Sequence, residues 1–372
     1  MDKTKILLIT TLITLLSILP LISNVNANPT VYDKNVYLHE HASVTVASGI
    51  TTTHTMNTSA LYSSSAQVWN NSYTSTTAHS ILFYLYPRLA GQLSLSASVS
   101  NPLESYLVLE ANETVTANVT LTVLDVTNSS SSSTIATQSW SQKEISAGTY
   151  QFIISTSASA TISAGHTIGF NITIWNSNAT AYIWLYYDSS SYNSRLELPC
   201  SDHITVTVNT YSGTTASTEF AYQETINITA TVTDAFGGYD INTAQLYFIP
   251  EGFSSVILPS GYGTGIRISG SDTAYTNVYY YLYTPNSTEY VPNRWTPYAR
   301  VTDLSDNTIT NSGTKIGVSG PGGEQPPPEP PIPLPDIFYI FGPQLAMVLF
   351  VALIFFIVIV ALAIYIVLKG SK

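Results

Sequence analysis

The chain has 372 residues, of which only 9% are charged, and its formal net charge at pH 7 is −11. A disordered chain needs low hydrophobicity, and 45% of these residues are hydrophobic, so the composition argues against a mostly disordered protein. Lys and Arg total 12 and form no cluster, which argues against nucleic acid as a partner.

The first 27 residues have the pattern of an export signal. Lys3 and Lys5 provide a positive start, an apolar run follows over residues 6–22, and a small-residue site ends at Ala27. We therefore expect a signal peptide over residues 1–27 that is cleaved after Ala27. An uncleaved anchor is the alternative, but Thr, Ser and Pro residues interrupt the apolar run.

Residues 28–200 alternate apolar and polar side chains in short runs. The clearest run puts every second residue on one strand face, at Val115, Ala117, Val119, Leu121 and Val123. Other strands are expected at residues 31–38, 80–86, 92–99, 149–155, 168–174 and 180–187. The serine run at residues 129–133 is expected to form a turn. Many short strands without helical periodicity predict a β-sandwich of the jelly-roll-like kind over residues 28–200.

A second, shorter set of strands is predicted over residues 201–318, which fits an immunoglobulin-like (Ig-like) sandwich without a disulfide. Its strands are expected at residues 204–208, 225–233, 241–249, 277–283, 295–302 and 315–318. Cys200 is the only cysteine, so no intrachain disulfide can form, and we expect a buried thiol rather than an intermolecular disulfide.

Two motifs in this second set are familiar. Residues 232–241 read VTDAFGGYDI and residues 301–307 read VTDLSDN. They resemble motifs of Ig-like modules in prokaryotic, especially archaeal, surface proteins, with Asp306 in the place of a glycine. Residues 185–199 likewise look like the close of a sandwich module in such proteins. The resemblance covers residues 80–318; it implies a fold and a cell-surface setting and assigns no activity.

The C-terminal part has the pattern of a membrane anchor on a stalk. Residues 319–336 are a Pro/Gly-rich linker, expected to be extended in its Pro-rich half. Residues 337–368 are expected to form one transmembrane helix, because residues 345–368 are uncharged and long enough for a bilayer core of about 30 Å. Lys369 and Lys372 predict that residues 369–372 form a cytoplasmic tail. The protein is thus expected to be a single-pass type I cell-membrane protein with its N-terminus outside and the lipid bilayer as its partner through residues 337–368.

Nine Asn-x-Ser/Thr sequons predict a glycoprotein, given the export signal. They begin at Asn57, Asn70, Asn112, Asn118, Asn128, Asn171, Asn178, Asn227 and Asn286. Asn128, in the serine run, and Asn286, in a Pro-flanked turn, are the sites expected to be most accessible.

Two groups of residues suggest a metal site. Asp234, Asp240, Asp303 and Asp306 are expected near one end of the Ig-like sandwich, where their oxygens suit Ca²⁺. The interpretation we favour is that Asp234 and Asp303 end strands and accept hydrogen bonds from turn N–H groups. His39 and His41 have a spacing that suits Zn²⁺, although a solvated strand face is the favoured interpretation.

The sequence has no nucleophile elbow, no zinc-protease motif and no phosphate-binding loop, so we expect no enzyme and no obligatory cofactor. The Tyr-rich residues 182–187 and 279–283 are candidates for a contact surface. The first hypothesis is a membrane-anchored structural or adhesive protein, associated with the envelope or an S-layer, that binds glycans or neighbouring surface proteins. A membrane-tethered receptor or transporter-associated binding protein is the alternative, and a tethered hydrolase is the third.

Overall fold

The computed structural model describes residues 31–60, 66–72, 78–176, 180–201, 203–254, 256–285 and 294–320. The described residues are all-β, with strands in several sheets and no helix among them, which confirms the predicted fold class at this level. Within these ranges, no helix is long and apolar enough to cross a membrane. The predicted signal peptide, the membrane helix, the cytoplasmic tail and residues 321–336 of the linker lie outside the described residues.

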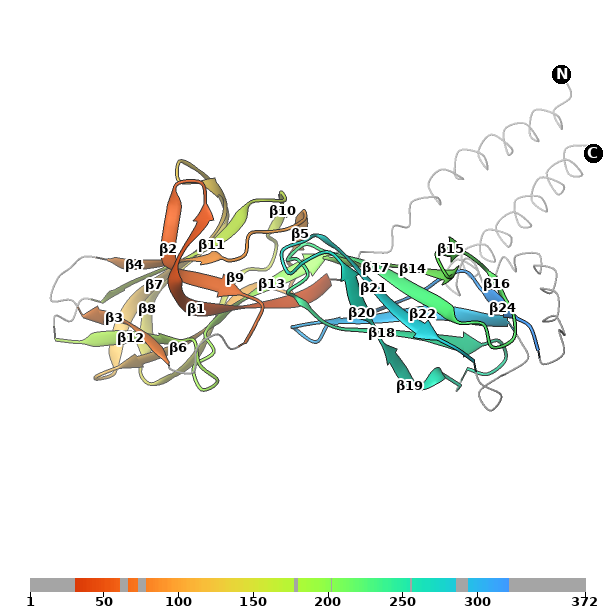
Figure 1. Cartoon of the computed structure of the whole chain (residues 1–372). Coiled ribbons are helices and arrows are strands. Elements are labelled where there is room, and N and C mark those ends of the chain that lie inside the picture. The colour runs from red at the N-terminus through yellow and green to blue at the C-terminus, as the bar shows by residue number, and fades with distance from the viewer. Residues whose placement is uncertain are drawn as a thin grey trace, which may run out of the picture. The chain divides into compact units, whose positions relative to one another are not determined.

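Strands β1 to β13 belong to one hydrogen-bonded sheet (Figure 1). Their bounds are β1 Val31–Ala47, β2 Ile50–Asn57, β3 Gln67–Ser72, β4 His79–Leu85, β5 Leu93–Ser96, β6 Leu103–Ala111, β7 Val115–Asn128, β8 Ser131–Ile145, β9 Gly148–Ser155, β10 Ser159–Ile162, β11 Thr167–Asn176, β12 Tyr182–Tyr187 and β13 Arg195–Ser201. Strand β11 pairs antiparallel with β4 on one side and β7 on the other, and β8 extends the sheet beyond β7. Strand β1 pairs antiparallel with both β13 and β2.

The apolar core of this sheet follows the alternation read from the sequence. Val115, Ala117, Val119, Leu121 and Val123 of β7 are all buried, and they belong to one cluster with alternate residues of β4 and β11. Full burial of a Val or Leu side chain contributes about 1.5–3 kcal/mol, so this face holds the strands together. Cys200 lies in the same cluster as a fully buried free thiol, as expected.

Strands β14 to β24 form two further sheets of five and six strands. Their bounds are β14 Ile204–Ser212, β15 Thr215–Ala216, β16 Glu219–Phe220, β17 Ile226–Asp234, β18 Ile241–Pro250, β19 Leu258–Thr264, β20 Ile266–Ser269, β21 Thr276–Tyr283, β22 Arg294–Asp303, β23 Thr308–Ser312 and β24 Ile316–Val318. Residues of both sheets share one apolar cluster, in which Trp295 of β22 is fully buried. The two sheets therefore bury one common core.

The loop that follows β17 packs onto the first sheet. Ala235 and Phe236 of this loop belong to the apolar cluster of β1–β13 rather than to that of β14–β24. The N–H groups of Ala90 and Gly91 donate hydrogen bonds to the carbonyl of Ala235, at 2.8 and 3.1 Å. The end of β17 is thereby held against the first sheet.

Candidate functional site

A fully buried lysine lies at the centre of the most strongly charged site in the described part of the chain. Lys34 in β1 shares its strand phase with Val36 and Leu38, both of which are buried core residues. Its own side chain is 0% exposed. A buried ammonium group is tolerated only when it is paired and hydrogen-bonded, so its partners determine whether this segment of β1 can pack.

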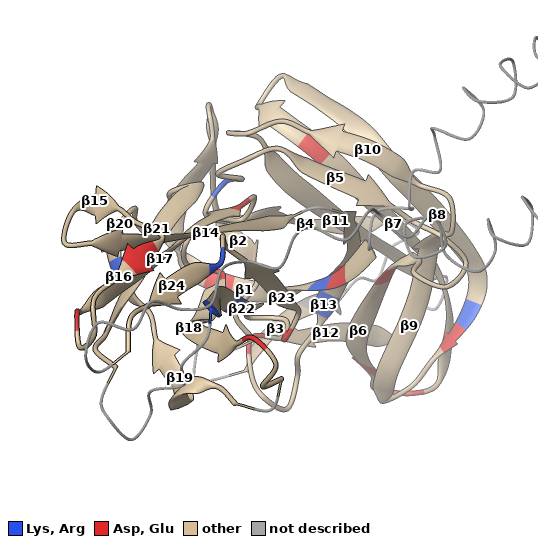
Figure 2. Cartoon of the chain, turned by 90° about the vertical axis from the view of Figure 1, so that its right-hand side faces the viewer, with Lys and Arg blue, Asp and Glu red and all other residues tan. Residues whose placement is uncertain are grey.

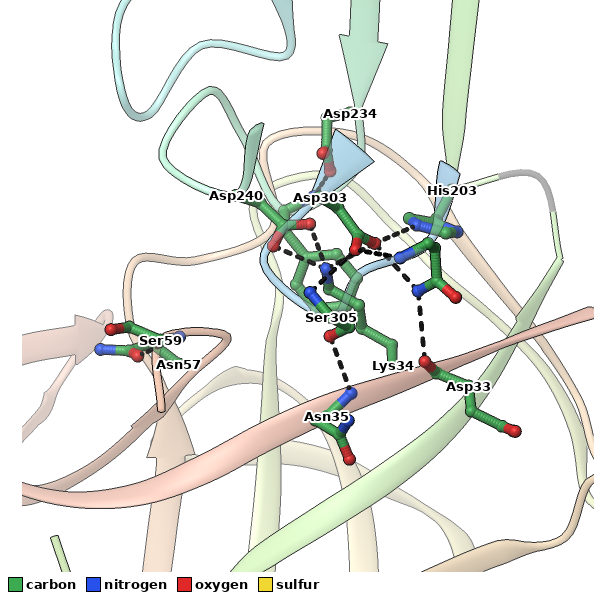
Figure 3. Close-up of polar contacts among 12 residues, drawn as sticks. Asp33, Lys34, Asn35, Asn57, Ser59, His203, Asp234, Asp240, Asp303 and Ser305 are labelled. Atoms are coloured by element: carbon green, nitrogen blue, oxygen red, sulfur yellow. Dashed lines mark hydrogen bonds and ion pairs between the residues drawn. The ribbon is translucent and has the colours of Figure 1, made fainter. Parts of the chain in front are cut away.

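Two carboxylates surround the Lys34 ammonium (Figure 3). Asp240, just before β18, accepts a hydrogen bond from Nζ at 2.6 Å through Oδ1. Its Oδ2 also lies 2.6 Å from Nζ, an ion-pair contact without hydrogen-bond geometry. Asp303, the last residue of β22, accepts a hydrogen bond from Nζ at 2.8 Å through Oδ2. The ring of Phe236 covers the nitrogen at 5.4 Å.

The carboxylate of Asp303 is the most fully hydrogen-bonded member of this group. Oδ1 accepts from the backbone N–H groups of Ser305 and Asn307, at 2.8 and 2.9 Å. Oδ2 accepts from the Asn307 amide and lies 3.0 Å from Nε2 of His203. Burial alone would raise the pKa of Asp303, but the hydrogen bonds and the Lys34 charge outweigh burial and hold the pKa well below its usual value.

Asp234, at the end of β17, behaves in the opposite way. Burial and the nearby charge of Asp240 raise the pKa of Asp234 well above its ordinary value. Its Oδ1 accepts a hydrogen bond from the N–H of Phe236 at 2.8 Å. Oδ2 of Asp234 and Oδ2 of Asp240 accept no hydrogen bond from a positioned donor. A protonated Asp234 can donate to Asp240, and this hydrogen bond adds to burial and the Asp240 charge in raising the pKa of Asp234.

We refer to Lys34, His203, Asp234, Asp240 and Asp303 as the Lys34 cluster; the side chains of all five are buried. Burial lowers the pKa of Lys34, but the charges of Asp240 and Asp303 prevail, so its pKa is raised and it stays charged. The arrangement is a buried ion-pair network that joins β1 to the ends of β17 and β22.

The structure brings together three of the four predicted calcium ligands. Asp234, Asp240 and Asp303 converge, whereas Asp306 is exposed on a turn with a φ of 63°. The turn hydrogen bonds expected for Asp234 and Asp303 are present. Within the described ranges, no group of three or more His, Cys, Asp or Glu residues is placed to hold a metal ion. Sequence reasoning missed Lys34, although a lone lysine on the apolar phase of a strand was the signal.

The two histidines are placed differently from each other, with His39 buried and His41 half-exposed. His39 is fully buried, with Nδ1 2.8 Å from Oδ1 of Asp188 and Nε2 3.0 Å from the carbonyl of Ser59. His41 has Nδ1 2.7 Å from the carbonyl of Ala42. The solvated strand face predicted for both residues is therefore wrong for His39, because its ring is inserted into the protein between polar partners.

The predicted sequons differ in accessibility. Asn57 is 8% exposed, and its Oδ1 accepts a hydrogen bond from the N–H of Ser59. Asn112 is exposed, while Asn118, Asn128, Asn171 and Asn227 are half-buried. Asn178 and Asn286 and the side chain of Asn70 lie outside the described residues.

An aromatic row lies on the outer face of β12. Tyr182, Trp184 and Tyr186 alternate with buried residues, so their rings share the outward face. The rings of Tyr182 and Trp184 are stacked at a centroid distance of 6.2 Å and an angle of 19°. Tyr192 stacks on Tyr186 at 4.8 Å. We refer to these four residues as the aromatic row; it presents flat apolar surfaces edged by hydroxyl groups.

The rest of the surface is poor in charge and rich in hydroxyl groups. Figure 2 shows Lys, Arg, Asp and Glu only at scattered places on the ribbon. Cross-strand hydroxyl pairs occupy the exposed faces of the sheets instead, at Thr120–Ser139, Thr122–Thr137, Ser80–Thr173, Thr205–Thr233 and Thr302–Thr308. Such a surface offers hydrogen bonds without attracting ions.

No family model and no curated protein matches the chain. Three solved structures are similar to the chain at a low level. An aminopeptidase from a marine sediment Thaumarchaeota archaeon has a TM-score of 0.30 and 8% identity over 45% of this chain and 37% of its own. An alpha-amino acid ester hydrolase has a TM-score of 0.26 and 12% identity over 32% of this chain and 25% of its own.

A DUF4785 family protein from Legionella pneumophila has a TM-score of 0.22 and 12% identity, over 69% of this chain and 65% of its own. The chain thus spans less than two thirds of each of these three structures. At such TM-scores the similarities carry no argument about function.

Proposed function

We propose that the chain is a membrane-anchored cell-surface protein of structural or adhesive type, associated with the envelope or an S-layer, which contacts neutral glycans or neighbouring surface proteins. The aromatic row is the observation that carries this proposal. Stacked Tyr and Trp rings with polar tips suit the apolar faces and hydroxyl groups of sugar rings. The charge-poor, hydroxyl-rich surface suits the same partners.

For the ectodomain we propose a jelly-roll-like sandwich over residues 28–200 followed by an Ig-like sandwich over residues 201–318. Strand β13, which ends at Ser201, belongs to the first sheet, and β14, which begins at Ile204, belongs to another sheet, which supports this division. A signal peptide cleaved after Ala27, a linker and one membrane helix over residues 337–368 complete the proposed type I topology. This topology rests on the sequence pattern alone.

The proposal is tested by the binding of neutral oligosaccharides and by cell–cell adhesion of cells that express the full chain. We expect Trp184→Ala and Tyr182→Ala to reduce both by at least about tenfold, because truncation of an aromatic residue that dominates a contact surface costs about 2 kcal/mol or more. Phe253→Ala is the matched control, since Phe253 is an aromatic residue of the second strand set that is 45% exposed. An unchanged response in the Trp184 and Tyr182 variants would overturn the proposed contact surface.

Surface location has a separate test. Protease treatment of intact cells should release fragments from residues 28–320 and leave the predicted tail protected. The mature N-terminus should be Asn28. Recovery of an intact chain from treated cells would contradict the predicted orientation.

A further inference from the structure

We propose that Lys34 and Asp240 become joined by an intramolecular amide bond between Nζ of the lysine and Cγ of the aspartate. The bond links β1 covalently to the segment that precedes β18. The inference goes beyond the proposed surface role and does not depend on it. It rests on the geometry of the Lys34 cluster.

The position of the lysine nitrogen is the first observation. Nζ lies 2.6 Å from each of the two carboxyl oxygens of Asp240. A point equally distant from both oxygens lies on the plane that also contains Cγ. The nitrogen is therefore centred on the carboxyl group, and Nζ and Cγ are within contact distance of each other.

The reaction is a condensation whose atoms balance within the pair. A proton passes from the Lys34 ammonium to the Asp240 carboxylate, which gives a neutral amine and a neutral acid. The amine lone pair forms the N–C bond, the C–O bond breaks, and the oxygen leaves as water with the acid proton and one amine proton. The products are a secondary amide and one water molecule, and neither an oxidant nor any co-reactant is needed.

Asp240 rather than Asp303 is the carboxyl group that reacts. All of the oxygens of Asp303 are held by donors, namely the backbone of Ser305, both N–H groups of Asn307 and Lys34, with His203 at 3.0 Å. These contacts stabilise the ionised carboxylate, which is a poor electrophile. Oδ2 of Asp240 accepts no hydrogen bond from a positioned donor, so it can take the proton of Asp234 and leave as water.

The neighbours of the pair supply the remaining requirements. Asp234 interacts with Asp240 and is placed to deliver a proton to the departing oxygen. Asp303 holds the lysine nitrogen in place at 2.8 Å. The side chains of Lys34, Asp240 and Asp303 are 0% exposed and Phe236 covers the nitrogen, so bulk water is kept from the amide once it has formed. Asp234 and Asp303 are positioning and proton-transfer residues in this scheme.

The direct test is peptide mapping of the full chain, purified in detergent, denatured and digested with trypsin and a second protease. We expect a branched peptide whose mass is that of the Lys34 and Asp240 peptides less one water, with fragment ions that locate the bond. Trypsin is expected not to cut after Lys34, because an acylated lysine is not a substrate. Recovery of the two linear peptides with an unmodified, cleaved Lys34 would overturn the proposal.

Variants separate chemistry from structure. Asp240→Ala should abolish the branched peptide, and Asp234→Asn should slow its appearance after synthesis by on the order of a hundredfold, as expected for loss of a general acid. Asp306→Asn, on the same turn as Asp303 but exposed, should leave its formation unchanged. Equal rates in the Asp234 and Asp306 variants would contradict the role of Asp234. If Asp240→Ala does not fold, the peptide map of the unaltered chain still decides the proposal.

Discussion

Nζ of Lys34 lies 2.6 Å from Oδ1 of Asp240, although 206 positions separate the two residues in the chain. Neither group is exposed to water. Removing such charges from water costs several kcal/mol for each ion unless the geometry of the pair is good. The start of β1 can therefore be buried only where the carboxylates of the second strand set receive it, and this contact specifies how β1 meets the loops after β17 and β22.

Replacement of Lys34 by Met should lower the free energy of unfolding by about 3–5 kcal/mol, since the buried carboxyl groups of Asp240 and Asp303 would lose their nitrogen partner. Urea unfolding of the full chain in detergent, followed by tryptophan fluorescence, measures this. Arg267→Met is the matched control: the Arg267–Asp272 ion pair is 35% and 70% exposed, and its loss should cost less than about 1 kcal/mol. A loss below about 1 kcal/mol in the Lys34 variant, as small as that expected for Arg267→Met, would show that the Lys34 cluster does not contribute to stability.

Stability should decrease in acid in a way that depends on Asp303. The pKa of Asp303 is lowered on folding, so the folded state binds fewer protons than the unfolded state. Asp303 therefore makes its full contribution to the free energy of unfolding above the unfolded pKa of 3.8. That contribution is lost as the pH falls below this value toward the lower pKa of the folded state. Asp303→Asn should have a lower melting temperature at pH 7 and a flatter dependence on pH below 4. If the melting temperature of Asp303→Asn fell with pH as steeply as that of the unaltered chain, Asp303 would not be the group responsible.

Calcium should leave the melting temperature of the unaltered chain unchanged relative to EDTA, because Nζ of Lys34 already fills the position between the carboxyl groups that were predicted to hold Ca²⁺. Lys34→Met removes that nitrogen, so only this variant should be stabilised by Ca²⁺. A site filled to 100 times its dissociation constant contributes about 2.7 kcal/mol, which thermal unfolding detects easily. The predicted metal site would be supported if Ca²⁺ raised the melting temperature of the unaltered chain and this rise were lost in the double variant Asp234→Asn, Asp303→Asn.

Glycan occupancy should follow accessibility. Asn57 is only 8% exposed, so we expect this sequon to be empty in the mature protein. Asn128, which lies at the β7–β8 turn, should be occupied. Mass spectrometry of glycopeptides measures both sites. Asn128→Gln should remove one glycan from the mass of the chain, whereas Asn57→Gln should remove none. A glycan found on Asn57 would show that it is added before this strand folds.

The alternation of apolar residues was sufficient to predict the strands that have one buried face. The strands predicted at residues 149–155, 225–233 and 241–249 match β9, β17 and β18 closely. The serine run was predicted to form a turn, but only its first two residues do so, and β8 begins at Ser131. Nearly all side chains of β8 are exposed or half-buried, so its sequence lacks the alternation of apolar and polar residues by which a strand is predicted. Its backbone is held by β7, and its hydroxyl groups pair with those of Thr120 and Thr122.

The site was only partly predictable. Local motifs identified Asp234, Asp240 and Asp303, because each stands next to a strand end in a turn-rich sequence. The same motifs could not identify Lys34, since its partners are 206 and 269 positions away and nothing in local sequence encodes that distance. A lysine on the phase of Val36 and Leu38 was still a sign that a buried counter-charge must exist elsewhere in the chain.

The position of β1 has a consequence for the order of folding. A chain that emerges N-terminus first exposes residues 31–37 early, yet these residues pair with β13, which begins at Arg195. Lys34 must remain hydrated for longer, until Asp240 and then Asp303 have been synthesised. Closing contacts over such long sequence separations is slow. Strand β1 therefore completes its contacts last, although it is synthesised first. Lys34 can be buried only after the residues of the second strand set that pair with it have been synthesised and folded.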